Sequence, residues 1–112
     1  MQIFVLVLNK VECLEPILEE MLEQKLHGAT VLDSTGMMRV LDEDENVDIP
    51  MFSLIRHMYN PERKHSKTLF TLLEDDQISK MMKIINDKTG GLQKPDTGIA
   101  FAAPISFVEG VK

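Results

Sequence analysis

The apolar residues of this chain alternate between two kinds of spacing, and that order restricts the fold to few architectures. A continuous apolar run, Ile3–Leu8, indicates a strand that lies centrally in a sheet. From Leu14 to Leu26 apolar residues recur every three or four positions, which predicts a helix with one apolar stripe. The alternation then repeats, with strands predicted at 30–41, 68–73 and 99–103, and a second helical stripe at Ile78, Met81, Met82 and Ile85.

Glycine, proline and charged residues predict where the two helices begin and end. Pro16 is tolerated only in a first turn, so the first helix should begin near Leu14. Lys25 and His27 suit its last turn, and Gly28 is expected to supply the left-handed stop.

The second helix has a polar start and a glycine end. Asp75 or Asp76 should cap it, and the run 89–91 (Thr-Gly-Gly) should end it. Gly36 lies inside the predicted second strand, where a glycine typically marks a bulge or a close approach of a ligand.

The predicted order is strand, helix, strand, strand, helix, strand, in 112 residues, which is enough for one domain spanning residues 1–112. This order predicts an α+β, ferredoxin-like βαββαβ fold, with an antiparallel four-stranded sheet and both helices on one face. The other face of the sheet has no helix to cover it, which favours oligomerisation.

Composition argues against several classes of function. The net charge of −6 and the few strand aromatics, Phe4 and Phe101 in the outer runs, argue against nucleic acid as a partner. The N-terminal apolar run is too short for a signal-peptide core, which predicts a cytoplasmic protein. Cys13 is the single cysteine and is expected to be a packing residue.

Residues 42–67 form a variable insertion between the second and third strands. Its first half is acidic and its second half is basic, and between them residues 49–59 can form a short helix capped by Asp48. Phe52, Ile55 and Tyr59 would share one face of that helix. Two interpretations stay open, a satellite core under the loop or a docking helix for a partner.

Three stretches of the chain together resemble the PII (nitrogen regulatory) signalling family. They are Gly-Ala-Thr-Val at 28–31, Thr-Gly-Met-Met-Arg at 35–39, and Thr-Gly at 89–90 followed by Asp-Thr-Gly-Ile-Ala-Phe at 96–101. The resemblance implies a cytoplasmic, non-enzymatic homotrimer that binds a small effector, an adenine nucleotide, between subunits. It also implies that residues 42–67 contact a partner enzyme or membrane transporter.

The resemblance further implies which residues bind the effector. Gly28, Thr30, Gly36 and Arg39 would face a loop of a neighbouring subunit that contains Asp96, Thr97 and Gly98. The chain departs from the family pattern in this loop, because Ile99 replaces its phosphate-binding lysine, with Lys94 as a stand-in. The paired arginines that the family carries near the C-terminus have no counterpart in 105–112. Both departures predict weak ATP binding.

Two alternatives share the predicted fold. One is a trimer like the CutA proteins, associated with metals, although His27, His57 and His65 have no ligand spacing. The other is a small acyl-phosphate hydrolase, which would need Arg39 beside Asn60 or Asn86.

Overall fold

The computed structural model describes residues 1–43 and 65–111. The strands are β1 (Gln2–Leu8), β2 (Thr30–Ser34), β3 (Ser66–Leu73) and β4 (Gly98–Pro104). The helices are α1 (Leu14–Glu23), α2 (Met37–Glu43) and α4 (Ile78–Thr89), and two single 3-10 turns, η1 (Val11–Cys13) and η3 (Asp75–Gln77), precede α1 and α4. No helix in the described part of the chain is long and apolar enough to cross a membrane.

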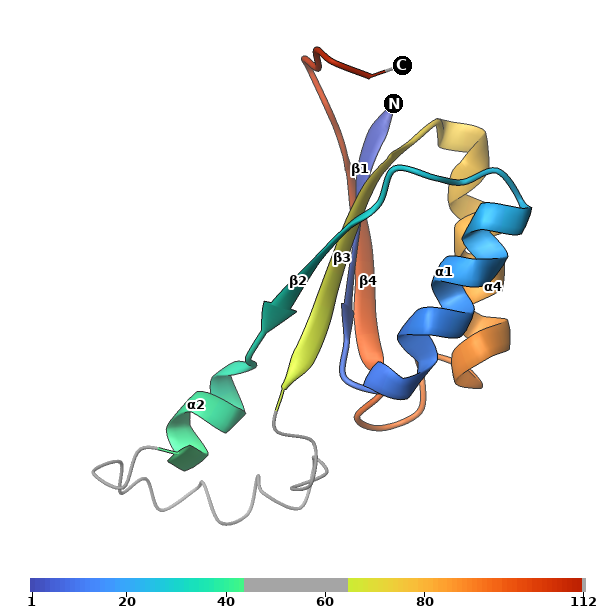
Figure 1. Cartoon of the computed structure of the whole chain (residues 1–112). Coiled ribbons are helices and arrows are strands. Elements are labelled where there is room, and N and C mark those ends of the chain that lie inside the picture. The colour runs from blue at the N-terminus through green and yellow to red at the C-terminus, as the bar shows by residue number, and fades with distance from the viewer. Residues whose placement is uncertain (44–64, 112) are drawn as a thin grey trace.

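The four strands form one antiparallel sheet in the order β2-β3-β1-β4, shown in Figure 1. The predicted ferredoxin-like fold class is confirmed, with α2 as an additional helix between β2 and β3. The apolar run of β1 occupies a central position, paired with β3 on one side and β4 on the other. Phe4, Leu6 and Leu8 on its helix-facing side are buried, whereas Ile3, Val5 and Val7 on the other side are only partly buried.

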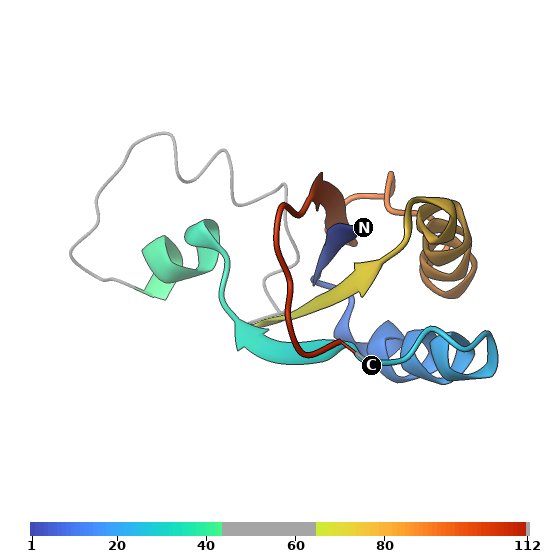
Figure 2. The same ribbon diagram turned by 90° about the horizontal axis from the view of Figure 1, so that it is seen from above.

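Helices α1 and α4 cover one face of the sheet, as Figures 1 and 2 show. The buried side chains between the two layers form a single core: Phe4, Leu6, Leu8, Cys13, Ile17, Met21, Leu26, Leu69, Leu73, Met81, Ile84 and Ile85. The predicted packing role of Cys13 is therefore confirmed.

Helix α1 begins at Leu14 as predicted but ends at Glu23, so the predicted stop at Gly28 is wrong. Lys25, at φ 64°, takes the left-handed position instead. Its N–H donates to Leu22 O and the next N–H donates to Met21 O, at 3.1 and 2.7 Å. These two bonds form a Schellman motif. The motif turns Leu26 inward, which explains why that side chain is buried although the helix has already ended.

The prediction that the second strand continues through 37–41, with Gly36 inside it, is wrong. The ladder between β2 and β3 ends at the pair Ser34–Ser66, so residues 37–43 have no described strand to pair with. They form α2, in which the N–H groups of Arg39 and Val40 both donate to Gly36 O at 3.1 Å. The backbone is thus satisfied locally, as the helix-favouring composition of this segment allows.

The second half of the sheet follows the prediction with small shifts. Strand β3 begins two residues earlier than expected, at Ser66. The prediction that Asp75 or Asp76 caps the second helix is wrong, because the N-cap of α4 is Gln77. Glu74 caps the preceding turn η3, and its N–H donates to the side chain of Gln77 at 2.8 Å. Gly90, at φ 86°, ends α4 as predicted.

The sheet face opposite α1 and α4 is mostly apolar, and none of its described strand residues is charged. Alternation along the registered strands assigns these residues to it: Ile3, Val5, Val7, Thr30, Leu32, Ser34, Ser66, Thr68, Phe70, Leu72, Ile99, Phe101 and Ala103. We call this set the open face. Leu32, Ile99 and Phe101 remain more than half exposed. The predicted helix at 49–59 falls outside the described residues.

Candidate functional site

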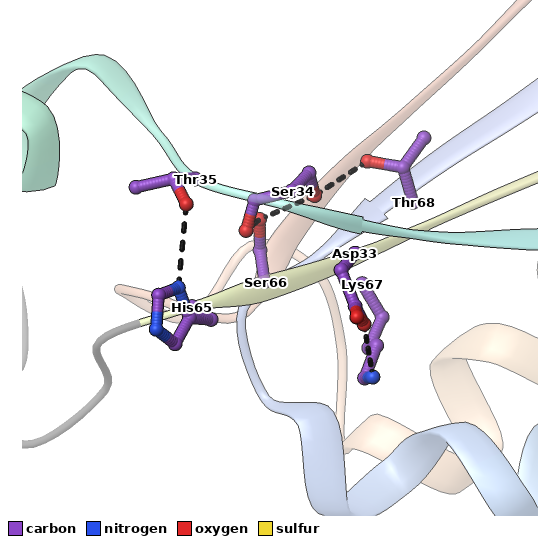
Figure 3. A network of polar contacts seen from close by, with 7 residues as sticks. All are labelled: Asp33, Ser34, Thr35, His65, Ser66, Lys67 and Thr68. Atoms are coloured by element: carbon purple, nitrogen blue, oxygen red, sulfur yellow. Dashed lines mark hydrogen bonds and ion pairs between the residues drawn. The ribbon is translucent and has the colours of Figure 1, made fainter.

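A polar network joins β2 and β3 at the end of the sheet where the insertion begins (Figure 3). The hydroxyl of Ser34 lies 2.7 Å from that of Ser66 and 2.8 Å from that of Thr68. One residue further out, the hydroxyl of Thr35 lies 3.3 Å from Nδ1 of His65. These contacts hold together the two chain segments that lead into and out of the insertion.

An ion pair between Asp33 of β2 and Lys67 of β3 continues this network. A hydrogen bond from Lys67, together with its positive charge, holds the pKa of the Asp33 carboxyl below its usual value. A lowered pKa means that the folded state favours the carboxylate. The pair therefore stabilises the fold above the ordinary aspartate pKa, and this contribution is lost as the pH falls through the lowered pKa.

We expect Lys67→Met to return the pKa of Asp33 toward the ordinary aspartate value, because the hydrogen bond and the charge of Lys67, the two largest causes of the lowered pKa, disappear. Carboxyl carbon NMR shifts recorded through an acid titration measure this directly. Lys83→Met, which removes a lysine from α4, is the control and should leave the Asp33 curve in place. Identical Asp33 curves in the wild-type protein and Lys67→Met would contradict the assignment.

A cavity of about 180 Å³ lies at the same end of the sheet, where β1 and β2 end and β3 and β4 begin. Four separate segments of the chain contribute to its wall: Asn9, Gly36, Met37, Met38, Arg39, His65, Ser66 and Asp96. We call it the neck cavity. Its wall combines a guanidinium, a carboxylate, an imidazole, a side-chain amide and two thioethers, so it can take a ligand that has both polar and apolar parts.

The loop before β4 is held rigidly against the end of β1, and this positions Asp96. The carbonyl of Thr97 accepts the N–H groups of Asn9 and Lys10 at 3.0 and 3.2 Å. Thr97 is buried, and its hydroxyl donates to Pro95 O at 3.4 Å. Asp96 adopts a left-handed φ of 55°, a conformation that aspartate tolerates better than most residues. The half-buried carboxylate is therefore fixed by its backbone.

Of the sequence-predicted site residues, Gly36, Arg39 and Asp96 line the neck cavity. In the structure all three belong to the same chain, whereas the resemblance places the loop of Asp96 on a neighbouring subunit. Thr97 and Gly98 follow Asp96 in the chain and are not among the described residues of the cavity wall. Arg39 is half-buried and reaches the cavity from the first turn of α2.

Three other predicted site residues lie elsewhere. Thr30 pairs with Phe70, four residues before the end of β2 and so about 13 Å along the strand, and Gly28 lies beyond it. Lys94 lies beside Gly90 and Gly91, on the wall of a different cavity at the end of α4. Within the described part of one chain, the neck cavity does not include these three residues.

Five residues of the cavity wall are not among the predicted site residues: Asn9, Met37, Met38, His65 and Ser66. Asn9, His65 and Ser66 each adjoin a strand end, which is the one signal in the sequence that points to them. Ser66 falls inside the predicted insertion 42–67, so the sequence does not predict its burial at the start of β3.

The residues required by the two alternative functions are not assembled in the described ranges 1–43 and 65–111. Those ranges contain no group of three or more His, Cys, Asp and Glu side chains placed to hold a metal. Asn86 lies at the cavity of Lys94, where its side-chain oxygen accepts the N–H of Leu92 at 3.1 Å. Asn60 falls outside the described residues.

Comparison with known proteins gives no family assignment. No family model matches the sequence, and no curated protein matches it. The confirmed fold and the neck cavity are therefore the basis for assigning a function.

Proposed function

We propose that this chain is a PII-like signal-transduction protein of the cytoplasm, a regulator and not an enzyme. It binds a small effector, an adenine nucleotide, at the neck cavity and assembles as a homotrimer. The bound effector controls how residues 42–67 engage a partner enzyme or membrane transporter. Nucleic acid is not its ligand.

One observation carries the proposal. Gly36 and Arg39 belong to one of the motifs that resemble the PII family and Asp96 belongs to another, about sixty residues away, yet all three line one cavity. The fold by itself brings the end of β2 and the start of β4 to one end of the sheet. The support for a binding site therefore lies in the residue types that meet there, a guanidinium and a carboxylate beside a glycine.

The chemistry of the wall suits an adenine nucleotide. Arg39 supplies a planar, permanently charged donor for phosphate oxygens. A carboxylate such as Asp96 can accept hydrogen bonds from ribose hydroxyls, and a side-chain amide such as Asn9 can pair with N6 and N7 of adenine. The cavity also agrees with the weak ATP binding expected from Ile99, because a single arginine balances little of the negative charge of three phosphates.

The size of the cavity supports a site shared between subunits. Its volume of about 180 Å³ is below the roughly 300–1,000 Å³ of ordinary ligand pockets. A second subunit packed on the open face, which ends at the same strand termini, would add another wall. Gly28, Thr30 or Lys94 of that subunit can then complete the site without lying near Arg39 of the first.

The position of the insertion supports its role as the output. Arg39, which precedes the insertion, and His65, which lies near its C-terminal end, both line the neck cavity. A ligand there contacts both ends of the insertion at once, so it can shift the population of its conformations.

A thermal-shift series with adenosine, AMP, ADP and ATP tests the proposal, with GDP as the control for the base. We expect ADP to raise the melting temperature clearly more than GDP, because guanine presents a carbonyl where adenine presents the N6 amino group. A ligand at about 100 times its Kd stabilises the fold by roughly 2.7 kcal/mol, which such a scan readily detects. Absence of any shift, or equal shifts with ADP and GDP, would argue against an adenine nucleotide site.

A further inference from the structure

The chain continues past β4 as an extended segment of residues 105–111, which we call the C-terminal arm. The arm is attached at its start, where the N–H of Ile105 donates to Met1 O at 3.2 Å. Beyond that bond, Phe107 is 77% exposed, and Val108 and Val111 are also exposed. Figures 1 and 2 show that the arm leaves the end of the sheet and crosses from the β4 edge toward the β2 edge.

The described part of the chain leaves the large apolar side chains of the arm exposed. None of its residues belongs to the buried core. An exposed phenylalanine and two exposed valines in so short a segment leave substantial apolar surface in water. Because the arm runs beyond the end of the strands, it does not cover the open face of its own sheet.

The open face needs additional contact area to form a stable interface. Strands about 4.8 Å apart, rising about 3.3 Å per residue, give a four-stranded face of this length roughly 450 Å². A stable interface buries about 800 Å² on each partner, so the face alone supplies about half of that area. An extended arm of seven residues with large apolar side chains can supply much of the remainder.

The lack of charge on the open face disfavours a strongly charged partner. The strand residues that form this face in the described part of the chain carry no charge, although the whole sequence has a net charge of −6. A strongly charged partner would find no counter-charge on it. The arm of a second copy, with Phe107 and Val108 at its centre and Glu109 as its first acidic residue, is chemically complementary to Leu32, Ile99 and Phe101.

We propose that the C-terminal arm of each subunit packs on the open face of a neighbouring subunit and is the main clamp of the assembly. This inference rests on the homo-oligomer of the proposed function. It assigns to residues 105–111 a role in subunit association, because side chains that are exposed to water in one chain become buried in the interface.

Sedimentation equilibrium over a range of protein concentrations tests the clamp, with Phe107→Ser as the variant. We expect its subunit dissociation constant to rise at least tenfold over the wild-type value. Leu22→Ser is the matched control, because Leu22 is similarly exposed, at 68%, but lies on α1 in the helical layer. That control should dissociate like the wild-type protein.

Each outcome separates the clamp from the rest of the proposed function. An oligomer that Phe107→Ser leaves as tight as the wild-type protein overturns the clamp and keeps the assembly. A wild-type monomer at all concentrations overturns both, while ADP binding is measured independently of either.

Isotope-filtered NMR of mixed labelled and unlabelled subunits gives a second readout that needs no substitution. We expect intermolecular contacts from the Phe107 ring to methyl groups of Ile99 and Leu32. Contacts of that ring with its own subunit only would overturn the clamp.

Discussion

Replacing Gly98 with alanine is expected to lower the free energy of unfolding by about 2–4 kcal/mol, through steric overlap and backbone strain together. Gly98 is the first residue of β4 and pairs with Leu8 of β1. A Cβ atom there would lie 2.5 Å from Val7 O and 3.3 Å from Leu8 Cα. Both atoms belong to the backbone of the central strand, so they cannot move aside as a flexible side chain can. The φ of Gly98, +155°, adds to the strain.

Urea unfolding at one fixed protein concentration measures this effect, since stability depends on concentration in an oligomer. Gly28→Ala is the matched control: Gly28 also has a positive φ, +105°, but no atom lies within 4 Å of its added Cβ. The control therefore isolates backbone strain, about 1–2 kcal/mol. An equal free energy of unfolding for Gly98→Ala and Gly28→Ala would contradict the close approach of the β4 backbone to that of β1.

Replacing Arg39 with alanine is expected to weaken ADP binding by about tenfold to a hundredfold. This range corresponds to the roughly 1.5–3 kcal/mol of a charge-assisted hydrogen bond. Adenosine has no phosphate, so its affinity should change little in the same variant. Arg39→Lys keeps the charge but loses the planar pair of donors, and an intermediate affinity for ADP is expected.

Isothermal titration of both ligands into each variant measures this difference. Lys83→Ala is the control for net charge, because Lys83 lies on α4 at a separate cleft between the two helices. It should bind ADP like the wild-type protein. Equal losses for ADP and adenosine in Arg39→Ala would mean that the variant distorts the cavity and that Arg39 does not bind phosphate.

The sequence was sufficient to predict the sheet and both packed helices because each has a strong periodic signal. The apolar run of β1 is typical of a central strand, and the apolar stripe of α4 is typical of a helix packed on a sheet.

The predicted end of α1 was wrong because Leu26 continues the helical spacing of apolar residues. In the structure Leu26 is buried by a Schellman turn at Lys25, after the helix has ended. Periodicity reports which side chains are buried, and two backbone paths can bury the same residue.

The strand predicted at 37–41 was wrong for a different reason. Whether this segment forms a strand or a helix depends on whether a neighbouring strand can pair with it, and β3 begins only at Ser66. Such a tertiary limit cannot be read from the segment itself. The neck cavity is similar, since Asn9 joins it only because the Thr97 carbonyl fixes the loop before β4 against the end of β1.

Amide shift mapping of ¹⁵N-labelled protein during titration with ADP shows whether an adenine nucleotide binds at the neck cavity. We expect saturable shifts at Asn9, Gly36, Arg39 and Asp96, with the amides of α1 and of the outer face of α4 unmoved. Shifts confined to Gly90–Lys94, or to the cleft between α1 and α4, would contradict the site. No saturable shift at any amide would contradict the ligand as well.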